Sequence, residues 1–203
     1  MAKKRAADPI KSVEDVHYIQ GLLKWGGKTH SKRNYLLFIL GITTGYRAGD
    51  LVKLRVVDIK TALRYGYFEI LESKKEKSGH TKNLRPRRVA IVSNLKKELK
   101  EYIKDKKDYE YIFYSQKGRH LSTKAVTDIL KDVGQSAKLY HLNLSAHSMR
   151  KTFAYTVWLN NGKDLLLVKE LLGHSTIEYT KLYLGLDIEL YGSSLKPLNN
   201  LII

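Results

Sequence analysis

The feature that most constrains the fold is a segment that is apolar on almost every side of a helix. It begins near Ser31, runs to the segment 43–47, and carries the residues Tyr35, Leu36, Phe38, Ile39, Leu40 and Ile42. A helix of this kind is stable only when other elements cover it from several directions. The sequence therefore predicts a domain packed around this helix.

An amphipathic helix is expected on each side of this central helix in the sequence. Before it, Ser12 can cap a helix whose apolar residues keep helical spacing until Gly26–Gly27 ends it. After it, residues 48–54 have the pattern of a short amphipathic helix. Both helices have an apolar face that can cover the central one.

Two strands and further helices complete the predicted fold. Residues 67–71 and 88–92 have strand character, and a lysine-rich loop at 74–83 lies between them. Later elements are expected as a short buried segment at 111–113 and helices near 94–107, 122–133, 146–160, 164–172 and 178–183. The expected fold class is mainly α with a small antiparallel β-sheet, an α+β fold.

The charge balance indicates the kind of partner. The 203 residues include 37 Lys and Arg against 20 Asp and Glu, which gives a net charge of +17. An excess of this size favours a polyanionic partner. The chain has no cysteine, no apolar run of the signal-peptide type after Met1 and no segment of membrane-spanning length. We therefore expect a soluble, cytoplasmic protein that does not insert into a membrane.

The segment 146–154 brings a histidine and an arginine together. His147 and Arg150 are three residues apart at the start of a predicted helix, so they share one of its faces. A guanidinium binds phosphate oxygens in a fork and an imidazole moves protons, so the pair suits a phosphate ligand. On its own, such a pair is more often part of an ordinary solvated helix face.

Three further signals accompany this pair. Arg47 lies in Thr44-Gly45-Tyr46-Arg47-Ala48-Gly49-Asp50-Leu51, where glycines at a helix junction allow the backbone to bring a cation close to a ligand. His174 follows a helix-ending glycine in Leu171-Leu172-Gly173-His174-Ser175, which presents its ring. Tyr183 follows His174 by nine residues, and only that spacing distinguishes it among 14 tyrosines.

Taken together, these motifs resemble those of the tyrosine recombinases, also called the phage integrase family. The chain has Thr-Gly-x-Arg-x-x-Asp-Leu at 44–51, His-x-x-Arg-Lys-Thr-Phe-Ala at 147–154, and Leu-Gly-His-Ser at 172–175 followed by the spaced tyrosine. Three motifs in the family's order are a specific signal. The resemblance covers residues 10–185 and implies the catalytic-domain fold of that family.

The resemblance implies a role for each matched residue. Arg47 corresponds to the first catalytic arginine, and His147 and Arg150 to the histidine and second arginine of the central motif. His174 corresponds to the position that is histidine or tryptophan in the family. Tyr183 corresponds to the nucleophile. Tyr179, the competing tyrosine five residues after His174, has the less usual spacing.

The family's catalytic lysine lies on a β-hairpin, and two positions compete for it here. Counting eight residues from Gly66 along the predicted strand favours Lys74, whereas the local spelling Lys77-Ser78-Gly79 favours Lys77. We take Lys74 and keep Lys77 as the alternative.

The resemblance further implies a site-specific DNA recombinase that cuts and rejoins DNA through a 3′-phosphotyrosine, without a metal or nucleotide cofactor. Double-stranded DNA is the implied partner, with the protein a monomer in free solution and a tetramer in synapsis, nucleoid-associated in a prokaryotic or phage setting. The basic side chains expected to contact DNA are Lys75, Lys77, Lys82, Arg87, Lys124 and Lys151. Two other functions remain open: a non-catalytic DNA-binding regulator on the same fold, and a nicking-closing enzyme of the type IB topoisomerase kind.

The expected organisation is a basic arm at 1–9, a catalytic domain at 10–185 and a tail at 186–203 that packs on a neighbouring subunit. Full-length integrases of the family carry an N-terminal helical domain, and only some 10–30 residues precede the catalytic pattern here. Two interpretations stay open: the catalytic domain of a longer integrase of a mobile element, or a short recombinase similar to the fimbrial phase-variation invertases.

Overall fold

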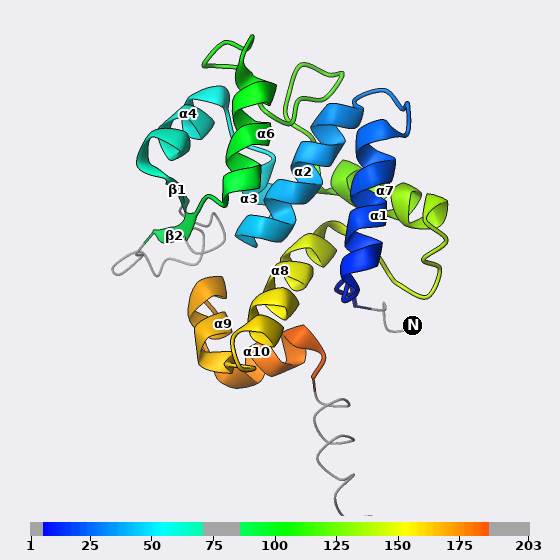
Figure 1. Ribbon diagram of the computed structural model, residues 1–203, viewed down its shortest axis with the longest axis vertical. Helices are drawn as coiled ribbons and strands as arrows, with labels where there is room; N and C mark the ends of the chain where they lie inside the picture. Colours follow the sequence, from blue (N-terminus) through cyan, green and yellow to red (C-terminus); the bar gives the residue numbers. More distant parts are fainter. Residues whose placement is uncertain (1–5, 71–85, 187–203) are drawn as a thin grey trace, which may run out of the picture. The chain divides into compact units, whose positions relative to one another are not determined.

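The computed structural model describes residues 6–70 and 86–186 (Figure 1). The chain divides into two compact units, a first unit that ends at Phe153 and a second unit that begins at Ala154. The boundary lies inside helix α8. The elements of the described residues, in chain order, are α1 (Val13–Trp25), α2 (Ser31–Thr44), α3 (Ala48–Leu51), α4 (Val56–Tyr65), β1 (Tyr67–Ile70), β2 (Arg87–Ala90), α6 (Ser93–Ile103), α7 (Thr123–Ser136), α8 (Ala146–Asn160), α9 (Leu165–Leu172) and α10 (Ile177–Leu184).

Helix α2 is the centre of the first unit, as its apolar sequence predicts. It lies between α1 and α6 and contacts both, and it also contacts α3 (Figure 1). Its residues from Leu36 to Gly41 are all buried. Burial of an aliphatic or phenyl side chain of this size contributes about 1.5–3 kcal/mol. The hydrophobic effect therefore fixes α2 as the axis on which the first unit is packed.

The structure has a helix, α4, where no element is expected from the sequence. Val56, Ile59 and Ala62 recur at helical spacing and are buried. Asp58 Oδ2 accepts the N–H of Arg55 at 2.8 Å, which satisfies a free donor at the start of the helix. Gly66 then ends the helix in the left-handed region, with φ +82°. The sequence did not predict this helix because its apolar stripe consists of only three residues.

The predicted antiparallel sheet is confirmed for the described residues. Strands β1 and β2 pair in the register that sets Tyr67 opposite Ala90 and Ile70 opposite Arg87. Phe68 and Val89 face each other across the pair and are buried, so this side of the sheet covers the core. The residues between the strands, 71–85, lie outside the described part of the chain.

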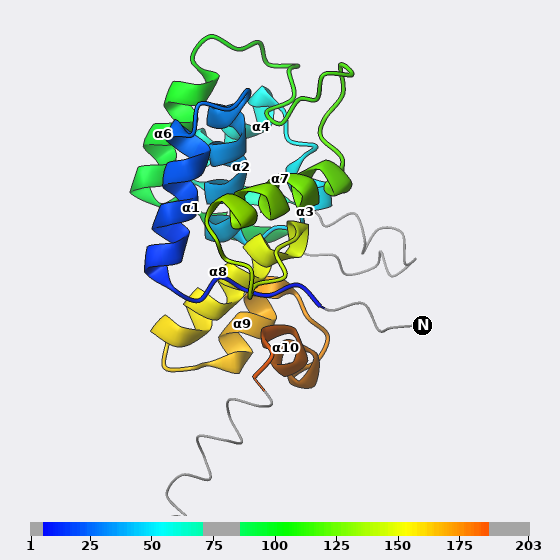
Figure 2. The same ribbon diagram turned by 90° about the vertical axis from the view of Figure 1, so that its right-hand side faces the viewer.

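Helix α7 (Thr123–Ser136) also belongs to the first unit. Ser122 caps it, because its Oγ accepts the N–H of Ala125 at 3.1 Å. The helix contacts α1 and α3 (Figure 2). Val126, Leu130 and Val133 form its buried stripe. The buried segment predicted before it is also confirmed, since Ile112 and Phe113 are fully buried.

The described residues of the second unit form the rest of α8, then α9 and α10, and these last two helices pack on each other. Asp164 caps α9 with its Oδ1, which accepts the N–H groups of Leu166 and Leu167 at 2.8 and 3.0 Å. Thr176 caps α10 in the same way. Among the described residues, no helix combines the length and the apolarity required to cross a membrane.

Candidate active site

The loop that carries Arg47 is shaped by a glycine. Gly45 ends α2 with φ +61°, and its N–H donates to the carbonyl of Gly41 at 3.1 Å. A Cβ at Gly45 would lie 2.2 Å from the ring of Phe153, so any larger residue would overlap that ring. Arg47 then begins α3 as its N-cap residue, with extended backbone. Gly45 therefore allows the loop that carries Arg47 to approach α8 closely.

Arg150 is fixed to the same loop from α8. Only 3% of its surface is exposed, and its Nη1 donates to the carbonyl oxygen of Gly45 at 2.9 Å. One turn earlier along α2, a Cβ at Gly41 would lie 2.5 Å from the sulfur of Met149. Gly41 in α2 and Gly45 directly after it thus make room for α8, and the second arginine of the predicted set is held close to the loop of the first.

His147 lies at the exposed start of α8. Ser145 Oγ accepts the N–H of His147 at 3.3 Å, and Ser148 Oγ accepts the N–H of Ser145 at 3.0 Å, so the two serines cap the helix. His147 and Arg47 line one cavity of about 550 Å³, together with residues of 48–53 and 120–123. The structure therefore brings this histidine and the first arginine to a common space, while Arg150 is buried.

Arg87 is also close to these groups. Its guanidinium lies 4.4 Å from the centre of the Tyr46 ring. Burial lowers the pKa of Arg87 to about 10, and the positive charges of Arg150 and Arg47 act in the same direction, while Tyr46 and Asp50 oppose them. Because Tyr46 directly precedes Arg47, the contact with its ring places the Arg87 guanidinium beside the loop of the first motif arginine.

Tyr46 was not singled out from the sequence, although it connects this neighbourhood to the sheet. It is buried, and its hydroxyl lies 3.1 Å from the carbonyl oxygens of both Phe68 and Arg87. The hydroxyl therefore ties β1 and β2 to the loop of Arg47. A tyrosine directly before the motif arginine is the only signal that the sequence offered for this contact.

In the second unit, the short loop from α9 to α10 brings two predicted residues together. Gly173 ends α9 with φ +63°, and His174 follows it. The rings of His174 and Tyr183 meet edge to face with centroids 5.1 Å apart. Tyr179 also contacts His174, at 4.8 Å, but it is 52% exposed. Both tyrosines therefore contact the histidine, and Tyr183 is the less exposed of the two.

Thr180 is a second residue that sequence reasoning missed. Its Oγ1 lies 3.0 Å from Nδ1 of His174 and donates to the carbonyl of Thr176 at 3.2 Å. Thr180 is fully buried, three residues before Tyr183 on the same helix. That spacing sets both side chains on one face of α10 and was the signal available in the sequence.

The remaining predicted residues have different surroundings. Lys74, Lys75, Lys77 and Lys82 lie outside the described residues. Lys124 is exposed on α7 and pairs with Asp128 at 2.7 Å. Lys151 is half-buried, and burial lowers its pKa although Asp8 acts in the opposite direction. Neither lysine lines the cavity of Arg47 and His147.

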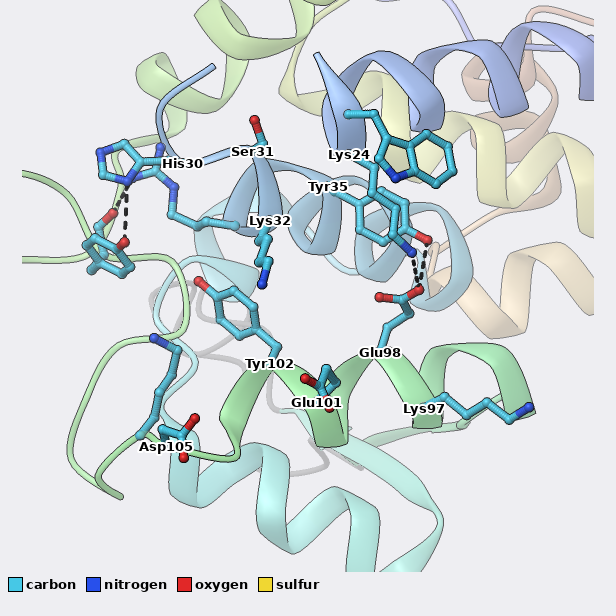
Figure 3. A pocket seen from close by; sticks show the side chains of 14 residues that line it. Lys24, His30, Ser31, Lys32, Tyr35, Lys97, Glu98, Glu101, Tyr102 and Asp105 are labelled. Atoms are coloured by element: carbon cyan, nitrogen blue, oxygen red, sulfur yellow. Dashed lines mark hydrogen bonds and ion pairs between the residues drawn. The ribbon is translucent and has the colours of Figure 1, made fainter. Parts of the chain in front are cut away.

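A larger cavity of about 1000 Å³ lies among α1, α2 and α6 (Figure 3). Glu98 points across it and binds Lys24 at 2.6 Å, while the Lys24 ammonium lies 4.6 Å from the centre of the Tyr35 ring. None of the described residues predicted to be catalytic lines this cavity. Its size alone does not make it the active site, because these charged groups already bind each other.

Comparisons with known proteins agree with the motifs. Residues 14–189 match the model of the phage integrase family. The probable integrase/recombinase YoeC of Bacillus subtilis (strain 168) is 31% identical over 180 residues, which cover 88% of this chain and 90% of YoeC. The tyrosine recombinase XerC of Lactobacillus leichmannii is 29% identical over 171 residues, 80% of this chain and 54% of XerC. The chain thus spans nearly all of the first relative and about half of the second.

A solved structure has the same fold. The XerH site-specific recombinase, bound to a palindromic difH substrate in a post-cleavage complex, matches with a TM-score of 0.67 and 21% identity. The match covers 95% of this chain and 54% of the XerH chain. The expected fold class, mainly α with a small antiparallel sheet, is thereby confirmed.

Proposed function

This chain belongs to the phage integrase family, and on that premise we propose that it is a tyrosine-type site-specific recombinase whose nucleophile is Tyr183. The observation that carries the proposal is the grouping of the motif residues: the phosphate-binding candidates lie together in the first unit, and the candidate nucleophile contacts a histidine in the second. Arg47 and His147 line one cavity beside the buried Arg150, and His174 contacts Tyr183 within the second unit. Relatives named integrase/recombinase and tyrosine recombinase support the same activity.

The proposed chemistry is transesterification at a DNA phosphate. The Tyr183 oxygen attacks the scissile phosphorus, a bond forms between that oxygen and the 3′-phosphate, and the bond to the 5′-oxygen breaks. His147 accepts the phenolic proton, and a lysine of the segment 71–85, with Lys74 preferred over Lys77, supplies a proton to the leaving 5′-oxygen. The 5′-hydroxyl of another strand then reverses these steps, so the phosphodiester energy is conserved.

Arg47 and Arg150 are proposed to bind the non-bridging oxygens, which gain negative charge in the transition state. Guanidinium groups suit this task because they remain charged and donate in a fork. Arg150 is already oriented by Gly45, so little reorganisation is needed when the phosphate binds. His174, oriented by Thr180, is proposed to donate one further hydrogen bond.

DNA is the proposed partner, and the net charge of +17 supports it. Strand exchange between two sites requires several protomers, so we propose a tetramer on DNA. The tail at 186–203 is proposed to pack on a neighbouring subunit, and the acting protein is proposed to be cytoplasmic.

A nicked suicide duplex tests the proposal, because the released fragment diffuses away and traps the covalent intermediate. The substrate is chosen from inverted repeats in the DNA that flanks the coding sequence, or by selecting bound duplexes from a randomised pool. The wild-type protein should form a covalent 3′ adduct, seen as a shifted band in a denaturing gel. Tyr183→Phe should abolish the adduct, and the matched variant Tyr179→Phe should retain it.

Other results would contradict the proposal. Sequence-selective binding without any adduct would favour a DNA-binding regulator on the same fold. An adduct that is lost in Tyr179→Phe and retained in Tyr183→Phe would show that the nucleophile is Tyr179 and not Tyr183.

A further inference from the structure

Arg87 and Arg88 are neighbours on β2, but their side chains have different surroundings. Arg88 is exposed, and its Nε donates to Oε2 of Glu69 at 2.9 Å. Successive side chains of a strand point to opposite faces. The Arg87 guanidinium accordingly lies on the other side, 4.4 Å from the centre of the Tyr46 ring. Only one of the two arginines therefore faces the loop that carries Arg47.

Three arginines from distant parts of the sequence meet at the segment 45–47. Arg150 donates to the carbonyl of Gly45, the Arg87 guanidinium lies over the ring of Tyr46, and Arg47 is the next residue. The Tyr46 hydroxyl also lies 3.1 Å from the carbonyl oxygen of Arg87. Arg87 is thus held at this segment by its backbone as well as by its side chain.

The arrangement concentrates positive charge where little water can screen it. The pKa of Arg87 is lowered to about 10, chiefly by burial and then by the charge of Arg150, with Arg47 acting in the same direction. The group remains charged at neutral pH, so the three like charges repel one another, while Tyr46 and the Asp50 carboxylate act on Arg87 in the opposite direction. An anion bound among them relieves that repulsion, and it does so most strongly when its own charge increases.

We propose that Arg87 is a third catalytic arginine, which acts with Arg47 and Arg150 on the non-bridging oxygens of the scissile phosphate. The inference rests on the proposed function, because it adds a residue to the same site. No bond to Arg87 forms or breaks and its proton stays in place. Its contribution is electrostatic stabilisation of the charge that develops as Tyr183 attacks.

The test compares Arg87→Gln with Arg88→Gln, two variants that remove one charge each from adjacent positions. On the suicide duplex we expect Arg87→Gln to form the adduct about 10²-fold more slowly, the usual effect of losing one preorganised donor. Arg88→Gln should stay within about threefold of the wild type, because an exposed ion pair contributes little. Both variants should bind the intact duplex with similar affinity.

A second substrate separates electrostatic catalysis from a merely structural role. A methylphosphonate at the scissile position has one charged oxygen fewer, so it needs less positive charge. Loss of Arg87 should then slow cleavage by less than about tenfold relative to the wild type on the same substrate. A structural role would give equal losses on both substrates, together with a lower melting temperature.

These experiments distinguish failure of the Arg87 assignment from failure of the recombinase proposal. If the wild-type protein forms no adduct with either substrate, the recombinase proposal fails. If the wild type forms the adduct and Arg87→Gln matches it, or loses the same factor on both substrates, the assignment of Arg87 is overturned and the recombinase proposal stands.

Discussion

The two units hold their proposed catalytic groups by different means. In the first unit, Arg150 lies against backbone in a crowded interior: it donates to the Gly45 carbonyl, and Gly45 has no room for a Cβ beside Phe153. In the second unit, the rings are held by side chains on two short helices. His174 contacts Thr180 through Nδ1 and meets the ring of Tyr183 at 5.1 Å.

In the proposed mechanism, the first unit stabilises the charge on the phosphate, and the second unit supplies the nucleophile. Groups fixed by a packed backbone are preorganised, so a substitution among them should affect the folded state and the rate together. Groups fixed by a single side-chain hydrogen bond can be disturbed while the surrounding helices remain folded. Apart from loss of the nucleophile itself, variants at the arginines of the first unit should therefore have larger effects than variants of the residues that orient the rings of the second unit.

The largest effect after loss of the nucleophile is expected at Arg150. Arg150→Lys keeps the charge but loses the fork and the bond to Gly45, so adduct formation should slow by about 10²–10³-fold. Arg33→Lys is the matched control. Arg33 is also a buried arginine, and its Nη1 donates to the backbone carbonyl of Tyr114 at 2.6 Å. Single-turnover cleavage of the suicide duplex gives both rates.

The Arg33 variant should lose stability without slowing cleavage at saturating protein. If both lysine variants slow cleavage equally, the effect of Arg150 comes from general loss of packing rather than from the phosphate site.

The second effect is on stability and compares two glycines. Gly45→Ala meets both an unfavourable φ of +61° and the ring of Phe153 at 2.2 Å, so it should lower the free energy of unfolding by about 2–4 kcal/mol. Gly185→Ala, at the end of α10, has a φ of +69° and nothing within 4 Å of the added Cβ. It should lose only about 1 kcal/mol.

Urea titrations followed by circular dichroism measure both glycine variants against the wild type. Equal losses in the free energy of unfolding would mean that the close approach of Phe153 to Gly45 adds nothing to the effect of the positive φ. The first unit would then be no more tightly packed at its glycine than the second.

Much of the fold follows from local patterns. The all-round apolar helix 31–44, the cap at Ser122 and the helix start before His147 depend on residues close in sequence, and each was predicted. The motif residues were likewise proposed from glycines, caps and spacing that lie close together in the sequence. Helix α4 was local as well, and its three-residue stripe was simply missed.

The contacts that build the site could not be predicted in this way. The bond from Arg150 to Gly45 joins residues 105 positions apart, and Tyr46 reaches the Arg87 carbonyl across 41 positions. The sequence identified the pair His147 and Arg150 as sharing a helix face, but the packing of α8 against Gly41 and Gly45 buries one and leaves the other exposed. Such outcomes depend on tertiary packing rather than on helical spacing.

The smallest effect is expected at Thr180, which orients His174 in the second unit. The one proton of the Thr180 hydroxyl points to the carbonyl of Thr176, so its oxygen accepts the Nδ1–H of His174. That bond fixes which ring nitrogen carries a proton and how the ring is turned. Thr180→Val removes it, and adduct formation should slow by about tenfold, equivalent to about 1.4 kcal/mol.

Thr180→Ser retains the hydroxyl and is the matched control, expected within about threefold of the wild type. Both variants should keep the melting temperature of the second unit within a few degrees, because a net side-chain hydrogen bond contributes only about 1 kcal/mol. A Thr180→Val protein as slow as Arg150→Lys would show that the second unit is as tightly preorganised as the first. A Thr180→Val protein as fast as the wild type would show that Tyr183 needs no oriented histidine beside it, since its ring contact with His174 remains in that variant.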